Sequence, residues 1–157
     1  MTTANVVFSG PADVVKPTVR EFIVASGETI YPGMLVEVNS SGEAITHNTD
    51  GQGGYYFIAD MNTLEQKLVT AALTIGGTGQ FFYPRPGETY NLYLAAGQTI
   101  TVGEALTSNA AGAVKSAAVD GTDEILAYAE EAVTTTGATG RVRARIATAG
   151  RNADTTA

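Results

Sequence analysis

The side chains that could perform catalysis are few in this chain. His47 is its single histidine, cysteine is absent, and no G-x-S-x-G turn occurs in the 157 residues. A Ser-His-Asp or Cys-His mechanism would have to use His47, and a zinc site would need several nitrogen or sulfur ligands. His47 stands between Thr46 and Asn48 in a polar stretch. We therefore expect an exposed loop histidine without a partner.

Carboxylates offer no clearer site. Adjacent acids occur at Asp123-Glu124 and at Glu130-Glu131, but neighbours on a strand point to opposite faces, so neither pair forms the shared site of a glycosidase. Residues 48–53 lack the further acids of a calcium loop, and residues 76–79 lack the Lys-Ser/Thr ending of a phosphate loop. The sequence predicts no catalytic site, no metal site and no cofactor. A hydrolase would need His47 or a carboxylate pair that folding brings together.

Arginines alternate with apolar residues near the end of the chain. If residues 141–146 form a strand, Arg141, Arg143 and Arg145 lie on one face of it. Two interpretations remain open. The arginines pair with the acids at 123–124 and 130–131 across the last hairpin, where an opposite-charge pair contributes roughly 0.2–1 kcal/mol. Alternatively, they form a docking face for a partner.

The charge balance argues against nucleic acid as that partner. The chain carries 9 basic and 16 acidic residues, for a net charge of −7, and an acidic body repels DNA and RNA at ordinary salt. No apolar run approaches the roughly 18 residues of a membrane span, and the first residues lack the pattern of a secretion signal. We expect a protein that is made soluble, with no nucleic acid or membrane partner.

The first twenty residues are predicted to form an extended arm ahead of a β domain over residues 21–148. Two prolines in this stretch argue against a helix there. We expect a disordered tail over residues 149–157, which is polar after Gly150. The arm is either a frayed terminus or a segment that docks on a neighbour. The second interpretation rests on its short apolar group, formed by Val6, Val7 and Phe8.

Two stretches within the β domain, residues 27–45 and 97–115, align without a gap at a spacing of seventy positions. Glycine supplies backbone angles that other residues rarely adopt, so recurring glycines mark recurring turns. Each unit is therefore predicted to be a strand, a tight turn, a strand and a second turn. The matching positions are Gly27, Gly33, Asn39 and Gly42 in the first unit and Gly97, Gly103, Asn109 and Gly112 in the second.

The remaining pattern predicts an all-β fold, either a small barrel or a sandwich, with at most one short helix. The helix would lie over residues 61–71, where apolar residues recur at helical spacing and Asn62 with Glu65 resembles a capping box. All-β chains must protect their sheet edges, and association into an oligomer is one way to do so. Further strands are expected over residues 55–59, 79–83, 89–94, 125–129 and 141–146.

The second glycine unit and the strands after it resemble the core of capsid decoration (cement) proteins of tailed bacteriophages. The resemblance rests on residues 97–114, on the alternating strand at 125–132, and on the basic-apolar strand at 141–146. Residues 82–87, which lead into the strand at 90–92, are also similar. It covers roughly residues 20–148 and does not extend to the arm.

The resemblance implies a structural protein of the virion. Such proteins bind the outer surface of the expanded head, commonly as trimers on the major capsid protein, and stabilise it against the pressure of packaged DNA. They need no cofactor and catalyse no reaction. On this reading the arm could add as a strand to the capsid protein or to a neighbouring subunit. The residues expected at capsid or inter-subunit contacts are Val6, Val7, Phe8, Arg141, Arg143 and Arg145.

An adhesive module on the virion is the alternative. A host-surface or glycan-binding domain would present aromatic side chains along a groove. Tyr31, Tyr93 and Tyr128 are the first residues to consider for such a groove. The two classes differ in partner, since one binds the capsid protein and the other binds a cell-surface sugar.

Overall fold

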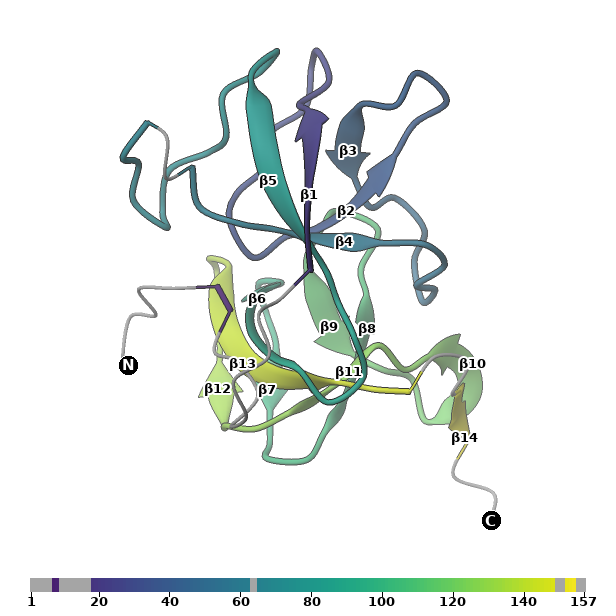
Figure 1. Cartoon of the computed structure of the whole chain (residues 1–157). Helices are drawn as coiled ribbons and strands as arrows, with labels where there is room; N and C mark the ends of the chain where they lie inside the picture. Colours follow the sequence, from purple (N-terminus) through teal and green to yellow (C-terminus); the bar gives the residue numbers. More distant parts are fainter. Residues whose placement is uncertain (1–6, 9–17, 63–64, 149–151, 155–157) are drawn as a thin grey trace.

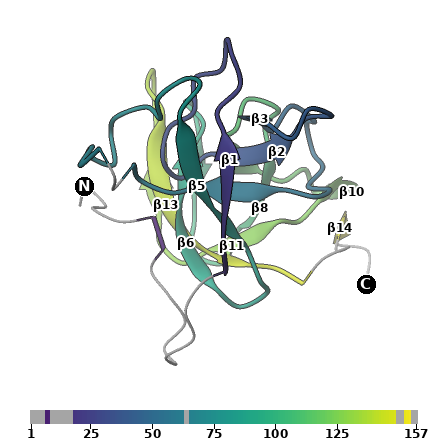
Figure 2. The ribbon, with the colours of Figure 1, turned by 45° about the horizontal axis from the view of Figure 1, so that its top comes forward.

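The computed structural model describes residues 7–8, 18–62 and 65–148, together with the backbone of 152–154. The described residues form an all-β fold, as the sequence predicts, and contain no helix. Figure 1 shows two β units, one above the other, and Figure 2 turns the upper unit toward the viewer.

The upper unit is a five-stranded sheet. All neighbouring strands in this sheet are antiparallel. β1, at one edge, pairs only with β5 among the strands. In spatial order the strands are β1 (Thr18–Ile23), β5 (Thr78–Tyr83), β4 (Phe57–Ala59), β2 (Leu35–Val38) and β3 (Ala44–Thr46).

The lower unit is a closed five-stranded barrel. Its strands, in order, are β11 (Ala127–Ala129), β13 (Gly140–Ile146), β6 (Thr89–Leu94), β9 (Val114–Ser116) and β8 (Ala105–Ser108). Two short pairs complete the fold. They are β7 (Thr99–Ile100) with β12 (Val133–Thr134), and β10 (Asp120–Glu124) with β14 (Asn152–Asp154).

The two units are copies of one arrangement. β1, β2, β3, β4 and β5 of the upper unit correspond to β6, β8, β9, β11 and β13 of the lower unit. The hairpins agree residue by residue at the spacing of seventy, because Val36 faces Thr46 in one unit as Leu106 faces Ser116 in the other. The repeat expected over 27–45 and 97–115 therefore exists, and it extends to the whole unit.

The two edges of each unit are joined in the same way. A parallel bridge from Val24 to Ala44 links the edges of the upper unit, and the parallel pairing of Leu94 with Val114 closes the lower barrel. The matching glycines of both units have positive φ, between 73° and 88°. This explains why glycine recurs at these positions, since other residues adopt such angles at a cost in free energy.

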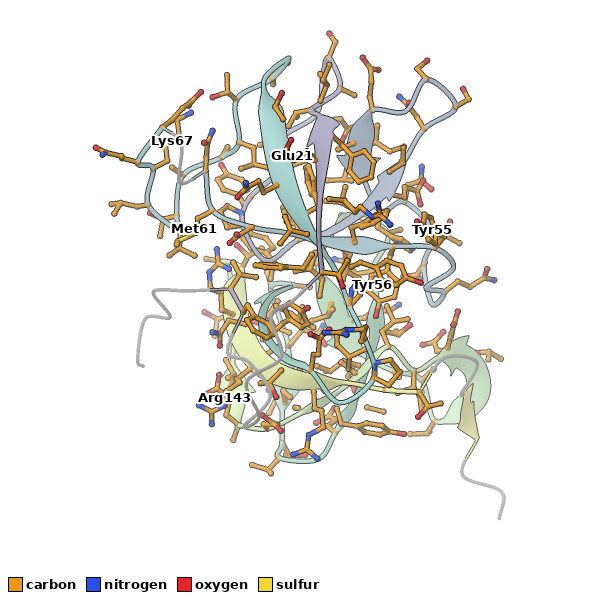
Figure 3. The ribbon with its side chains drawn as sticks, in the orientation of Figure 1. Glu21, Tyr55, Tyr56, Met61, Lys67 and Arg143 are labelled. Atoms are coloured by element: carbon orange, nitrogen blue, oxygen red, sulfur yellow. The ribbon has the colours of Figure 1, made fainter. Side chains whose placement is uncertain are left out.

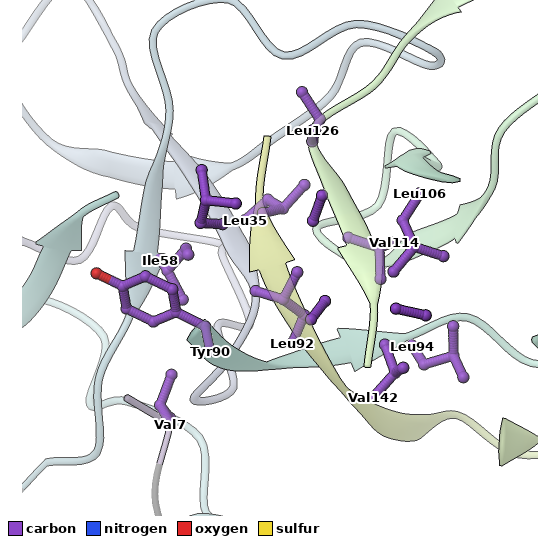
Figure 4. Packing of buried hydrophobic residues seen from close by; sticks show 14 of the residues in the cluster. Val7, Leu35, Ile58, Tyr90, Leu92, Leu94, Leu106, Val114, Leu126 and Val142 are labelled. Atoms are coloured by element: carbon purple, nitrogen blue, oxygen red, sulfur yellow. The ribbon is translucent and has the colours of Figure 1, made fainter. Parts of the chain in front are cut away.

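The largest apolar cluster joins the two units. Leu35, Ile58 and Phe82 of the upper unit pack with Tyr90 and Leu92 of the lower unit. Figure 4 shows Leu35, Ile58, Tyr90 and Leu92 of this cluster. A second cluster fills the interior of the upper unit around Phe57 and Phe81. The largest apolar cluster is thus common to the two units.

The described residues of 61–71 do not form the short helix that the spacing of their apolar side chains predicted. The Glu65 amide does bond to Asn62 Oδ1 at 3.1 Å, as a capping interaction requires. Gln66 takes a left-handed backbone angle, with φ of 53°, which is incompatible with a right-handed helix at this position. The described part of this segment consists of turns.

The structure also bears on the expected ends of the β domain. β1 begins at Thr18, three residues before the boundary expected at residue 21. Within the expected tail over 149–157, residues 152–154 form β14 and pair with β10. The other tail residues lie outside the described part of the chain.

Candidate interaction surface

The single histidine is buried where the two units meet, so the expectation of an exposed His47 without a partner was wrong. Only 2% of His47 is exposed. Its Nε2 lies 2.9 Å from the Gly53 carbonyl oxygen, and its Nδ1 lies 2.8 Å from Ser108 Oγ. Since a carbonyl can only accept, Nε2 carries a hydrogen and donates it to Gly53, while Nδ1 shares a hydrogen bond with the Ser108 hydroxyl. His47 therefore holds the upper unit to the end of β8.

The arginines at the end of the chain have two different roles. Arg145 donates to Glu130 Oε1 from Nε at 2.9 Å and from Nη2 at 2.7 Å. Arg143 Nε lies 3.9 Å from the other oxygen of Glu130. The backbone amide of Arg143 also donates to Glu131 Oε1 at 2.8 Å. The charge pairing expected across the last hairpin is thus present between these two arginines and Glu130, whereas Glu131 accepts from the Arg143 backbone.

Arg141 does not join that pairing. Its Nη2 donates to the Val69 carbonyl of the upper unit at 2.8 Å, and its guanidinium lies 5.7 Å from the centre of the Tyr93 ring. Burial lowers the pKa of Arg141, partly offset by Tyr93. Arg141 therefore links the long connection between β4 and β5 to the lower unit, and it is not part of an exposed arginine stripe.

The acids at 123–124 also lie away from the arginines, contrary to expectation. Asp123 Oδ2 accepts from the Ala118 amide at 2.7 Å, and Glu124 Oε2 accepts from the Gly53 amide at 2.8 Å. These carboxylates thus fix loop backbone instead of pairing with arginine. The hydrogen bond from the Gly53 amide to Glu124 is therefore a second link between the lower unit and the loop that contains His47 and Gly53.

The described part of the arm packs on its own chain. Val7 is 1% exposed, and its carbonyl accepts from the Asn91 amide at 2.6 Å. Phe8 pairs with Tyr90 of β6, and its ring centre lies 5.8 Å from that of Phe82. The arm therefore adds to the edge of β6 within the molecule. Val6 lies outside the described residues.

The exposed arginines border an open depression of about 630 Å³. It is also lined by half-buried Tyr128 of β11, by the turn at 102–103 and by Glu130. Arg143 is labelled in Figure 3, in the lower unit. Charged side chains, one exposed valine and a tyrosine thus line this surface.

The tyrosines considered for a sugar site are dispersed. Tyr31 and Tyr93 stack on each other, with ring centres 5.8 Å apart and planes 4° apart, where the two units meet. Tyr128 lies in the depression beside the arginines. A separate hollow of about 110 Å³ is bordered by Tyr55 and Tyr83. Tyr55 is 65% exposed there.

No cluster of His, Asp or Glu that could hold a metal ion occurs within the described ranges. Helices capable of crossing a bilayer were likewise not found among these residues. Sequence reasoning missed the contact between the two units, where the Tyr93 amide donates to the Gly33 carbonyl.

Comparison with known proteins supports the fold. No protein-family model and no curated protein matches the chain. Among solved structures, the fold is similar to the head fiber gp8.5 N base of bacteriophage phi29. The TM-score is 0.52 at 14% sequence identity, and the match covers 83% of this chain and 95% of that one. That neighbour is a structural protein of a phage head, and at this identity the likeness establishes a shared fold.

Proposed function

We propose that this chain is a structural protein of a phage virion that decorates the outer surface of the expanded head. The observation that carries the proposal is the fold it shares, over most of its length, with the base of a phage head fiber. The glycine-turn and strand motifs, which resemble capsid decoration proteins, support the same class. The net charge of −7 fits an outer-surface protein that does not bind the packaged DNA.

In this role the partner is the major capsid protein, and the chain acts as a homo-oligomer, a trimer by the resemblance. It stabilises the shell against internal DNA pressure and catalyses no reaction. Arg143 and Arg145 are proposed for the contact with the capsid or with a neighbouring copy, because both are exposed beside the depression. Val7 and Phe8 would contribute indirectly, by covering the edge of β6.

A stability assay on DNA-filled heads tests the stabilising role. Heads stripped of this protein are heated with and without the purified chain, and DNA release is followed with a dye that does not enter intact heads. We expect release at a higher temperature when the chain is present. Unchanged release at saturating protein would contradict a cement role.

A glycan-binding module is the second candidate, favoured by the hollow beside Tyr55 and Tyr83. An exposed tyrosine next to prolines can stack on a sugar ring. Binding of the chain to host-cell glycans, lost on Tyr55→Ala and retained on Tyr31→Ala, would support this candidate. Equal loss in both variants would point to a folding defect instead.

A further inference from the structure

The two units meet at a joint between a turn and a strand edge. The Tyr93 amide of β6 donates to the Gly33 carbonyl of the upper unit at 2.9 Å, and Tyr31 stacks on the Tyr93 ring. The approach is close, since a Cβ on Gly33 would lie 2.7 Å from the Asn91 carbonyl oxygen. We call the turn at 31–33 together with the β6 edge at Asn91 and Tyr93 the internal joint.

The turn of the internal joint occurs a second time, at residues 101–103. The Gly103 amide donates to the Ala129 carbonyl at 2.8 Å, as the Gly33 amide donates to the Ala59 carbonyl at 2.7 Å. The surroundings differ. Pro32 and Gly33 are buried, whereas residues 101–103 are exposed, and a Cβ on Gly103 would meet nothing within 4 Å. The lower unit therefore presents a turn that has the shape of a joint and no partner among the described residues.

The strand edge of the internal joint also occurs a second time, on β1. Glu21 and Ile23 correspond to Asn91 and Tyr93 of β6. The amides of the two β6 residues bond to carbonyls of the arm and of the upper unit. The corresponding amides of β1 face the same edge, where no described residue accepts from them. An edge strand whose amides have no acceptor among the described residues is a template for pairing with another chain.

Both uncovered surfaces carry exposed apolar side chains. On β1, Val19 is 43% and Ile23 is 50% exposed, and Val102 of the turn is 70% exposed. Figure 3 places Glu21 of β1 in the upper unit and Arg143 in the lower unit. The surfaces thus belong to different units of one molecule. Burial of these three side chains would stabilise an association between molecules.

We propose that a second copy of this chain docks head to tail, with its β1 edge on the turn 101–103 of the first copy. The Gly103 carbonyl then accepts from the Ile23 amide, as the Gly33 carbonyl accepts from the Tyr93 amide within one chain. Such a contact joins two different surfaces and can close into a ring. The inference assigns the contact surfaces of the homo-oligomer in the proposed function and rests on that part of it.

The contact between copies differs chemically from the internal joint. Within one chain the rings of Phe82 and Tyr90 lie 5.4 Å apart. In the contact between copies, the equivalent positions hold Arg145 of the first copy and Arg20 of the second. Glu130, bound to Arg145, supplies a negative charge beside them. Charged groups here make the contact weaker than the internal joint and sensitive to salt.

Cysteine cross-linking tests the contact directly, because the chain has no cysteine of its own. Ile23→Cys and Thr101→Cys occupy the positions that correspond to the stacked Tyr93 and Tyr31. The two full-length variants are mixed, treated with a short bis-maleimide, and separated under denaturing conditions, with an affinity tag on one of them. We expect a dimer that contains one chain of each variant, and neither variant alone should give it. Ser40→Cys, exposed on the turn after β2, replaces Ile23→Cys in the control mixture and should give none.

The same mixture is treated free in solution and after binding to expanded heads. A mixed dimer in either condition, at a yield well above the Ser40→Cys control, supports the contact. No excess over the control in both conditions overturns it. Binding to heads without the mixed dimer would remove this contact and leave the decoration role standing. A mixed dimer without binding to heads would support this contact and contradict the decoration role.

Discussion

The internal joint predicts that two equivalent glycines respond differently to the same substitution. Gly33 and Gly103 have φ of 88° and 85°, so alanine meets the same backbone strain at both, about 1–2 kcal/mol. At Gly103 the new methyl group meets open space. At Gly33 it would lie 2.7 Å from the Asn91 carbonyl oxygen and would contact the Arg141 guanidinium.

The Asn91 oxygen belongs to the backbone, so relief of the clash requires the two units to move apart. Overpacking of this kind adds about 1–3 kcal/mol. We therefore expect Gly33→Ala to lower the free energy of unfolding by about 1–3 kcal/mol more than Gly103→Ala does. For a chain of this size, each kcal/mol lowers Tm by about 2–4 °C.

Urea unfolding followed by tyrosine fluorescence, with a thermal melt on the same samples, measures the difference. Dilute protein is used so that any contact between copies at Gly103 is absent. Equal losses for the two variants would refute the close approach at the internal joint. A larger loss for Gly103→Ala would refute the assignment of the two turns.

Three further predictions concern single residues. His47→Ala leaves the Ser108 hydroxyl and the Gly53 carbonyl without their buried partner, so we expect a loss of about 1–3 kcal/mol for each group in urea unfolding; a loss below that of an exposed control such as Asn48→Ala would contradict the buried role. A double-mutant cycle on Glu130 and Arg145 should give a coupling of about 0.2–1 kcal/mol that falls with added salt, because Arg145 is largely exposed; a salt-independent value would be inconsistent with this pairing. Burial raises the pKa of Asp60, partly offset by the Met61 amide. An acid whose pKa rises on folding binds its proton more tightly in the folded state, so stability falls as the pH rises through that pKa. Asp60→Asn should therefore be more stable than the parent chain at neutral pH and lose this advantage in acid, as urea midpoints across that range would show; an advantage that grows in acid would be the opposite sign.

Local chemistry in the sequence was enough to predict the turns. Glycine and asparagine act on the backbone next to them, and Asn39 Oδ1 accepts from the Ser41 and Glu43 amides, each at 2.9 Å. Asn109 does the same in the second unit, at 3.0 Å and 3.1 Å. The alternation at 141–146 likewise predicted a strand. In the structure this strand is part of β13, and its apolar face is buried in the barrel.

Contacts between distant residues could not be predicted in the same way. The partners of His47 include Ser108, sixty-one positions away, and nothing local distinguishes a buried polar loop from an exposed one. Arg141 looked equivalent to Arg143 and Arg145 because all three alternate on one strand. Their roles differ because the connection between β4 and β5 places the Val69 carbonyl beside Arg141, whose guanidinium donates to it.

Binding to phage heads is the most direct test of the proposed function. The purified chain is sedimented with expanded and with unexpanded heads of the source phage, both stripped of this protein, and bound protein is measured against total protein. The account predicts saturable binding to expanded heads alone, at an occupancy set by the symmetry of the lattice. No binding to expanded heads, or equal unsaturable binding to both forms, would contradict it.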